Sequence, residues 1–170
     1  AATTGASQTA LGYNALGADT KGQNSVAVGH NALATQNLTT ATNTYNVAVG
    51  SQAGLVISTG TENTLIGGLS GDAITTGASN VALGVSSLGA NTVGSQTVAI
   101  GNQALTAQNY GTATDSLNTA VGFQAGLSVT TGIRNTIVGG NAGDALTDAD
   151  KNTVVGQGAL SADTLGSLST

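Results

Sequence analysis

The sequence lacks cysteine, proline, methionine and tryptophan, and only 6% of its residues are charged. Without cysteine, neither a disulfide framework nor thiolate chemistry is available. Three basic residues stand against eight acidic ones, for a formal net charge of -5, so no basic patch can neutralise nucleic-acid phosphates. Aromatic residues make up 2% of the chain, which leaves Val, Ile, Leu, Ala and Thr to build the core.

Long apolar runs are also missing, and this excludes a membrane-spanning helix within the sequence. The first ten residues, AATTGASQTA, lack the basic and apolar segments of an export signal, so we expect any export signal or anchor outside this stretch. Disorder is not expected, because mean hydropathy is positive and the aliphatic residues are evenly distributed. At 170 residues, the chain predicts a single domain over 1–170.

One short motif dominates the sequence. A tetrad of Thr or Val, two aliphatic residues and Gly occurs nine times, as in NSVAVGHNAL and QTVAIGNQAL. The spacing from one tetrad to the next is 17, except at two places where it is 21, and the order of the spacings repeats with every fourth tetrad. Repeats of this kind predict a solenoid. The predicted turns start near Thr9, Val26, Val47, Thr64, Val81, Val98, Thr119, Thr136 and Thr153.

Each tetrad has the pattern of a short strand that ends in a turn, and we number positions from its Thr or Val. Positions 1 and 3 share one face of the strand, and position 2, which is Ala in six of the nine turns, points to the other. Because both faces are apolar, something must cover the second one. The small residues at position 2 favour a second chain that approaches closely on that side.

Other positions recur along the predicted turns. Small residues at position 10 and hydroxyls at position 12 predict a second strand near positions 10 to 12. Position 8 is Leu where position 11 is polar (Leu16 with Asp19), and Gly where position 11 is aliphatic (Gly54 with Ile57). One bulky side chain per turn is therefore expected to fill a shared space. Asn precedes the tetrad in six turns, which predicts an axial ladder of stacked amides.

Strings such as NSVAVGHNAL, NTAVGFQAG and NVALGVSSL resemble the head repeats of YadA-like trimeric autotransporter adhesins, and the same repeats occur in some phage tail-fibre proteins. The resemblance covers nearly the whole chain. It implies a parallel β-roll, an all-β left-handed β-solenoid, with three chains packed side by side as a homotrimer. It also implies an extracellular location, on a cell surface or in a virion fibre, and attachment to a host surface glycan or protein.

Candidate binding residues lie where the repeat is interrupted or varies. The two 21-residue turns, 26–46 and 98–118, each hold four extra residues, and solenoid insertions usually map to one face. Position 5 varies freely, which predicts an outward edge. Packing between chains is the alternative role for the long turns and for Phe123. The candidates are Tyr45, Tyr110, Gln36, Asn37, Gln108 and Asn109 in the long turns, with His30 and Phe123 at position 5.

The sequence shows no catalytic constellation. His30 is the only histidine, so a catalytic or metal-binding role for it is not expected, and GQGALS at 156–161 misses the dinucleotide pattern. Asp72 and Asp144, at equivalent turns, faintly resemble Gly-Asp calcium repeats, but turn capping explains them better. We therefore expect no enzyme activity, no cofactor and no metal.

Two functions are consistent with these patterns. The first is a non-enzymatic adhesin head or fibre domain that attaches to a host cell or another surface. The second is a structural subunit of an extracellular filament that grows by end-to-end stacking of the rolls. Ice binding by the hydroxyls of position 12 is a third, weaker alternative, because that column is single-file and lies beside a packing position.

Overall fold

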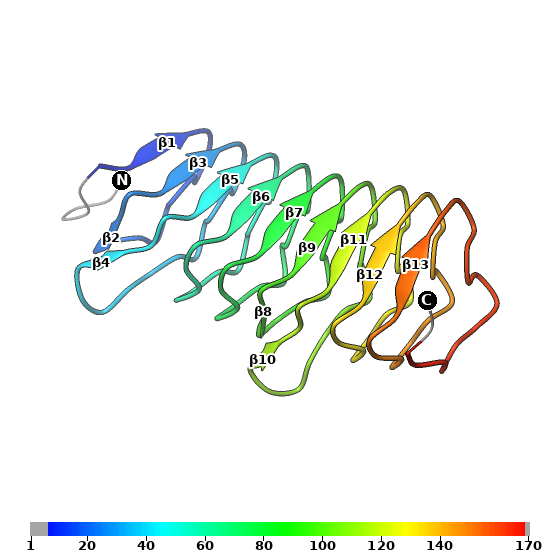
Figure 1. Cartoon of the computed structure of the whole chain (residues 1–170). Coiled ribbons are helices and arrows are strands. Elements are labelled where there is room, and N and C mark those ends of the chain that lie inside the picture. The colour runs from blue at the N-terminus through cyan, green and yellow to red at the C-terminus, as the bar shows by residue number, and fades with distance from the viewer. Residues whose placement is uncertain (1–6, 169–170) are drawn as a thin grey trace.

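The computed structural model describes residues 7–168, which form an all-β parallel solenoid without a helix. The turns stack along one axis, with β1 at one end of the stack and β13 at the other (Figure 1). A sheet of nine strands contains one three-residue strand from every turn, in the order of the chain. Its strands are β1 (Thr9–Leu11), β3 (Val26–Val28), β5 (Val47–Val49), β6 (Thr64–Ile66), β7 (Val81–Leu83), β9 (Val98–Ile100), β11 (Thr119–Val121), β12 (Thr136–Val138) and β13 (Thr153–Val155).

The tetrads are in register throughout this sheet. Position 1 of each turn pairs with position 1 of the next, from Thr9 with Val26 to Thr136 with Thr153. The pairs β3 with β5 and β9 with β11 span the two long turns, and every other neighbouring pair spans a short one. The predicted solenoid and its repeat lengths are therefore confirmed.

The Gly at position 4 is required by the close approach of successive turns. In all nine turns its φ lies between 127 and 143°, a region that L side chains rarely adopt. In the first eight turns an added Cβ would also overlap the carbonyl oxygen of the equivalent Gly in the next turn. Gly84, for example, would place its Cβ against the carbonyl oxygen of Gly101. This Gly ends the strand and sets the distance between turns.

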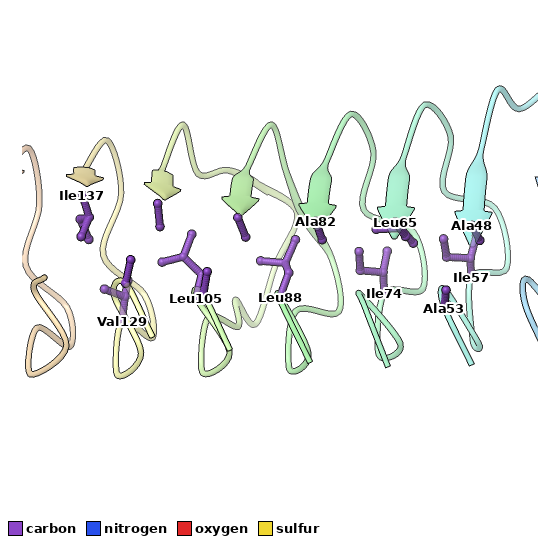
Figure 2. Close-up of a cluster of buried hydrophobic side chains, with 14 of the residues drawn as sticks. Ala48, Ala53, Ile57, Leu65, Ile74, Ala82, Leu88, Leu105, Val129 and Ile137 are labelled. Carbon is purple, nitrogen blue, oxygen red and sulfur yellow. The ribbon is translucent and has the colours of Figure 1, made fainter. Parts of the chain in front are cut away.

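The core is a single column of aliphatic side chains inside the stack (Figure 2). Leu88 and Leu105 occupy position 8, while Ile57 and Ile74 reach the same space from position 11. The predicted alternation of one bulky residue per turn is therefore confirmed. Position 8 is left-handed even when it holds Leu, with a φ of 55° at Leu88. Burying a Leu side chain contributes about 2 kcal/mol, which offsets a backbone cost of about 1 kcal/mol.

The assignment of the two strand faces from the sequence was wrong. Position 2 points into the solenoid, where Ala82 is fully buried, whereas positions 1 and 3 point outward and are partly or fully exposed. Position 2 is small because the interior is narrow and the aliphatic side chains of positions 8 and 11 already fill it. Where position 2 is large, as at Leu65, its methyl groups lie over the glycines of position 8, Gly54 and Gly71. Any covering chain must approach positions 1 and 3.

The second strand predicted at positions 10 to 12 was also misplaced. Those positions form bends and irregular backbone and not a strand. They are joined to the next solenoid turn by single backbone hydrogen bonds, such as that from Thr75 N–H to Thr92 O at 2.8 Å. The hydroxyls of position 12 donate to carbonyls of the next turn, as Thr75 Oγ1 does to Thr92 O, 3.0 Å. Short strands occur instead at positions 14 and 15 of two short turns and at positions 17 and 18 of the long turns that follow them. They form two pairs: β2 (Gly22–Gln23) with β4 (Thr42–Asn43), and β8 (Gly94–Ser95) with β10 (Thr114–Asp115).

The predicted ladder of asparagines is confirmed and is buried. Asn63 Nδ2 donates to Gly77 O at 3.0 Å, and Asn63 Oδ1 accepts from both the backbone N–H and the Nδ2 of Asn80. Asn80 repeats these contacts with Gly94 O and with the N–H of Thr97. Each buried amide therefore satisfies a carbonyl of its own turn and a backbone N–H of the next one.

Replacing Gly84 by Ala tests whether the spacing of the turns depends on position 4. We expect Gly84→Ala to lower the free energy of unfolding by about 3 kcal/mol or more, because it combines an unfavourable φ with an overlap against Gly101 O. Gly111→Ala is the matched control, since a Cβ there meets no atom within 4 Å. Denaturant unfolding of both variants gives the comparison. Equal stability of the two variants would contradict this role of Gly84.

Candidate functional site

The two 21-residue turns carry the irregular parts of the repeat. Their extra residues bulge from the stack on the same side, at β4 and at β10 (Figure 1). We call residues 37–44 and 109–116 the two tongues. The described tips of the tongues, Thr39 to Ala41 and Gly111 to Ala113, are exposed. The prediction that both insertions map to one face is confirmed.

Gln36 and Gln108, predicted as binding residues, are fully buried and have a structural role instead. Gln36 Nε2 donates to Asp19 Oδ2 at 2.7 Å, and Gln36 Oε1 accepts from Asn46 Nδ2 at 2.8 Å. In the same way, Gln108 donates to Thr97 Oγ1 and accepts from Asn118 Nδ2. Each glutamine thus joins the asparagine ladder across a long turn, and its amide cannot reach an external partner.

The neighbouring hydroxyls show the same construction twice. Ser25 is hydrogen-bonded to Thr44 in the first long turn, and Thr97 to Ser116 in the second, where Ser and Thr have changed places. One Ser and one Thr are kept in each buried pair, so its volume is the same in both copies. This equality of volume indicates that the base of each tongue is a packed and fixed structure.

Tyr110 is likewise buried, with only 6% of its surface exposed. Its hydroxyl donates to Gly132 O at 2.9 Å and accepts from Asn118 Nδ2 at 3.3 Å. The ring lies where a Cβ on Gly94 would be, within 3 Å of that position. Burial raises the pKa of the Tyr110 hydroxyl to about 12. Tyr110 anchors the second tongue to the stack.

The two tongue tyrosines are not equivalent, although the sequence analysis grouped them. Superposing the second long turn on the first places Leu38 at the position of Tyr110, and Leu117 at the position of Tyr45. Leu38 and Tyr110 are both buried, whereas Tyr45 and Leu117 are both about half exposed. Aligning the two long turns by their tetrads, instead of by residue type, would have separated the anchoring residue from the exposed one.

The remaining candidates lie in two different places. Asn37 and Asn109 are exposed and continue the hydroxyl column of position 12, accepting from Thr20 Oγ1 at 3.2 Å and from Thr92 Oγ1 at 2.8 Å. Tyr45, His30 and Phe123 are exposed beside the strands of the large sheet. His30 stacks on Tyr13 of the preceding turn, with ring centroids 5.5 Å apart. The eight candidates therefore do not form one site.

The outward side of the nine-stranded sheet is a second candidate surface. We call it the apolar face: it consists of positions 1 and 3 of every turn, which hold only Thr, Val, Ile and Leu. Among the described residues, thirteen large hydrophobic side chains are exposed, and five of them lie on this face at position 3: Leu11, Ile66, Leu83, Val138 and Val155. Five more lie beside it, two residues before position 1 or at position 5: Tyr13, Tyr45, Val85, Leu117 and Phe123. Monomeric proteins rarely expose a contiguous apolar patch larger than a few hundred Å², so the apolar face is a candidate interaction surface.

The described residues show no centre for metal binding. Within 7–168, no three His, Cys, Asp or Glu side chains gather closely enough to hold a metal ion. The same part of the chain has no helix that is long and apolar enough to cross a membrane.

Comparison of the chain with protein families, curated proteins and solved structures found no match. The apolar face and the tongue tips are the candidate functional surfaces.

The buried hydroxyl of Tyr110 predicts a pH dependence at the alkaline end. A folded-state pKa of about 12, above the ordinary 10, stabilises the fold fully below pH 10, and this contribution is lost as pH rises from about 10 to about 12. The loss is about 2 kcal/mol. In Tyr110→Phe, we expect this loss to be absent and the neutral-pH stability to fall by about 1 kcal/mol.

Denaturant unfolding between pH 8 and pH 12 measures the effect. Tyr45→Phe is the control, because Tyr45 is half exposed and makes no contact of this kind. This variant is expected to keep the alkaline loss of stability. A Tyr110→Phe protein that loses stability with pH as the unmodified protein does would show that Tyr110 is not the titrating group.

Proposed function

We propose that this protein is a non-enzymatic extracellular fibre or adhesin head domain that works as a homotrimer and attaches to a host cell or another surface. The observation that supports the proposal is the apolar face, which is continuous over all nine strands. Successive strands about 4.8 Å apart make it about 38 Å long, and the three residues of each strand make it about 10 Å wide. This is about 400 Å², within the roughly 300 to 600 Å² of the largest apolar patch on a protein surface, which is often functional.

The flat side of a straight rod is best covered by a second copy of the same rod. The apolar face has the same two columns in every turn, so a partner with the same axial repeat can match it from end to end. Three parallel copies turned around a common axis would enclose their apolar faces in a shared core. The polar column at position 12 would then remain outside.

The tongues supply the contact surface in this proposal. They stand out from an otherwise regular stack, their bases are fixed by buried hydrogen bonds, and their tips expose backbone and Thr hydroxyls. A trimer would present two tongues from each of three copies. Repeated weak contacts of this kind raise the overall affinity by about 10² to 10⁴ without a deep pocket.

An extracellular filament built by end-to-end stacking is the alternative. Within the described residues, β1 and β13 each pair on one side only, and an open parallel edge can accept another strand. Electron microscopy of the purified protein separates the two proposals. Discrete short rods favour the fibre or adhesin domain, and long uniform fibres favour the filament.

The trimer is tested by placing a charge on the apolar face. Leu83 lies in the middle of the large sheet and is 44% exposed, so Leu83→Lys is compatible with the fold of the single chain. We expect the unmodified protein to have three times the 16.2 kDa chain mass in light scattering, and Leu83→Lys to be monomeric, because a buried unpaired charge is strongly unfavourable.

Thr76→Lys is the matched control for this experiment, since Thr76 is exposed at position 13, outside the apolar face. This variant is expected to stay trimeric. A monomeric unmodified protein would overturn the trimer, and so would a Leu83→Lys protein that stays trimeric.

Attachment is tested at the tongue tips. Replacing Thr39, Thr40 and Thr112 together by Ala removes three exposed hydroxyl side chains, and we expect it to weaken binding to whole cells or glycan arrays by on the order of tenfold or more. The control replaces Thr59, Thr76 and Thr131, which are equally exposed in 17-residue turns. Equal binding by the two triple variants would remove the tongues from the contact surface.

A further inference from the structure

Two columns of residues follow the Gly that ends each strand of the large sheet. They are positions 5 and 6, and they lie along the edge of the sheet at which the arrows end in Figure 1, whereas the tongues project at the opposite, lower edge. Position 5 includes the exposed aromatic residues Tyr13, His30 and Phe123. Position 6 holds an amide in six of the nine turns: Asn14, Asn31, Gln52, Gln103, Gln124 and Asn141.

Rings at position 5 stack on one another when successive turns both carry one. Tyr13 and His30 occupy this position in the first and second turns, and their ring centroids lie 5.5 Å apart with an angle of 14° between the ring planes. This separation is close to the spacing of about 4.8 Å between neighbouring strands, so the two rings face each other along the axis of the solenoid. The stack shows which way a ring at position 5 can face.

Phe123 lies in the same column, but the next turn has no side chain beside it. The residue at position 5 of that turn is Gly140, where a Cβ would meet only the carbonyl oxygen of Phe123, at 4.0 Å. Gly140 has no φ in the region that disfavours side chains, so the backbone does not require a glycine there. The place that His30 takes beside Tyr13 is thus open beside Phe123. We call this open place over Gly140 the Phe123 slot.

The backbone around Phe123 allows the ring direction that is seen at Tyr13. The Gly before Tyr13 has a φ of 133° and the Gly before Phe123 one of 143°, and the residue after each has a φ of 55°. In the orientation of Tyr13, the Phe123 ring turns one face toward the slot. Phe123 is 53% exposed, so a ring-shaped group from outside the chain can stack on it as His30 stacks on Tyr13.

A row of three amides at position 6 borders the slot. Gln124 Nε2 donates to Gln103 Oε1 at 2.8 Å, and Asn141 Nδ2 donates to Gln124 Oε1 at 3.1 Å. These hydrogen bonds fix the amides without saturating them, because each carboxamide has two N–H donors and two acceptor lone pairs. All three amides are partly exposed. The slot therefore has fixed donors and acceptors along one side.

A saccharide ring matches this combination of groups. One side of a pyranose ring carries C–H groups that pack on the negative face of an aromatic ring, while its hydroxyls both donate and accept hydrogen bonds. An aromatic side chain of a partner protein would stack on Phe123 but would leave the amide row without partners. Positions 5 and 6 hold no Asp, Glu, Lys or Arg in any turn, which favours a neutral saccharide over a charged one.

We propose that the Phe123 slot binds one ring of a neutral saccharide, which stacks on Phe123 over Gly140 and forms hydrogen bonds with Gln124 and Asn141. The slot lies at the edge of the sheet opposite the tongues, so this inference adds a second contact site to the attachment proposed for the tongue tips. Saccharide binding by the slot requires neither the tongues nor a particular number of copies.

The site can be observed directly, because Phe123 is the only phenylalanine of the chain. Isotopic labelling of phenylalanine then gives one set of ring signals in a nuclear magnetic resonance spectrum, and that set belongs to Phe123. An array of neutral oligosaccharides selects the probe, and the soluble form of a bound oligosaccharide is titrated into the labelled protein. We expect the Phe123 ring signals to shift with saturation. The proposal is overturned if none of the oligosaccharides shifts them.

Two variants and a matched control test the geometry of the slot. Gly140→Leu fills the slot and leaves Phe123 in place, whereas Phe123→Ala removes the stacking surface, and we expect each to weaken binding of the soluble oligosaccharide by about tenfold or more. Gly68→Leu is the control, because a Cβ on Gly68 meets only Ser51 O, at 3.9 Å, and Ser51 offers no ring. The control is expected to bind within about twofold of the unmodified protein.

Isothermal titration calorimetry gives the affinities, and far-ultraviolet circular dichroism checks that each variant is folded. Equal binding by Gly140→Leu and Gly68→Leu would overturn the proposal, and so would an unchanged affinity in Phe123→Ala. Titration of N-acetyltyrosine amide, a model of an aromatic side chain, provides the competing result. If this compound shifts the Phe123 signals and no saccharide does, the slot serves a protein partner and saccharide binding is wrong.

These outcomes are distinct from a failure of the proposed function. A protein that attaches to cells through its tongues but shows no saccharide at Phe123 would overturn the slot alone. A protein with a saccharide at Phe123 that attaches to no cell or other surface would overturn the attachment function and leave the slot in place.

Discussion

The close axial approach of successive turns is the constraint on which the rest of this structure depends. Gly67 N–H donates to Val49 O at 2.8 Å, and the same bond recurs at position 4 of every later turn. This approach leaves no room for a Cβ at that Gly, and it sets equivalent residues of all turns into columns. A residue in such a column must accept a near copy of itself as its neighbour. That requirement favours amides and hydroxyls, which can donate to one side and accept from the other, and β-branched residues, which stack well on a pleated surface.

The long turns show how the columns continue across an interruption. Four extra residues would separate Asn46 from the polar column of the preceding turns. Gln36 bridges the gap because its longer side chain reaches both Asp19 and Asn46 from within the long turn. The same solution appears at Gln108, with Thr97 in place of Asp19 as the acceptor. An insertion is therefore tolerated where a buried amide can satisfy the groups that the regular ladder would have satisfied.

Much of the fold follows from periodicity, and what was missed follows from its limits. The spacing of the tetrads gave the turns, their register and the asparagine ladder, because backbone pairing forces equivalent residues together. The tetrads did not show which strand face is inside. Alternation assigns neighbouring residues to opposite faces, but when both faces are apolar it does not tell which of them is buried. Only the bulky residues at positions 8 and 11 reveal that the interior is already filled opposite Ala82. For the site, residue type was misleading: Gln36, Gln108 and Tyr110 have polar groups that serve the fold itself, whereas the exposed tips have no distinctive chemistry.

Columns that serve the fold of the single chain differ from the outward ones in how their residues vary from turn to turn. A column that serves the fold of one chain keeps its residue type, as the asparagines do, or keeps the composition of a contacting pair. Ser25 with Thr44 in the first long turn and Thr97 with Ser116 in the second are such pairs. Positions 1 and 3 differ from these columns, because they keep only Thr, Val, Ile and Leu although they point outward from the solenoid. An outward column that stays aliphatic or β-branched in all nine turns is the basis for proposing that further copies cover the apolar face.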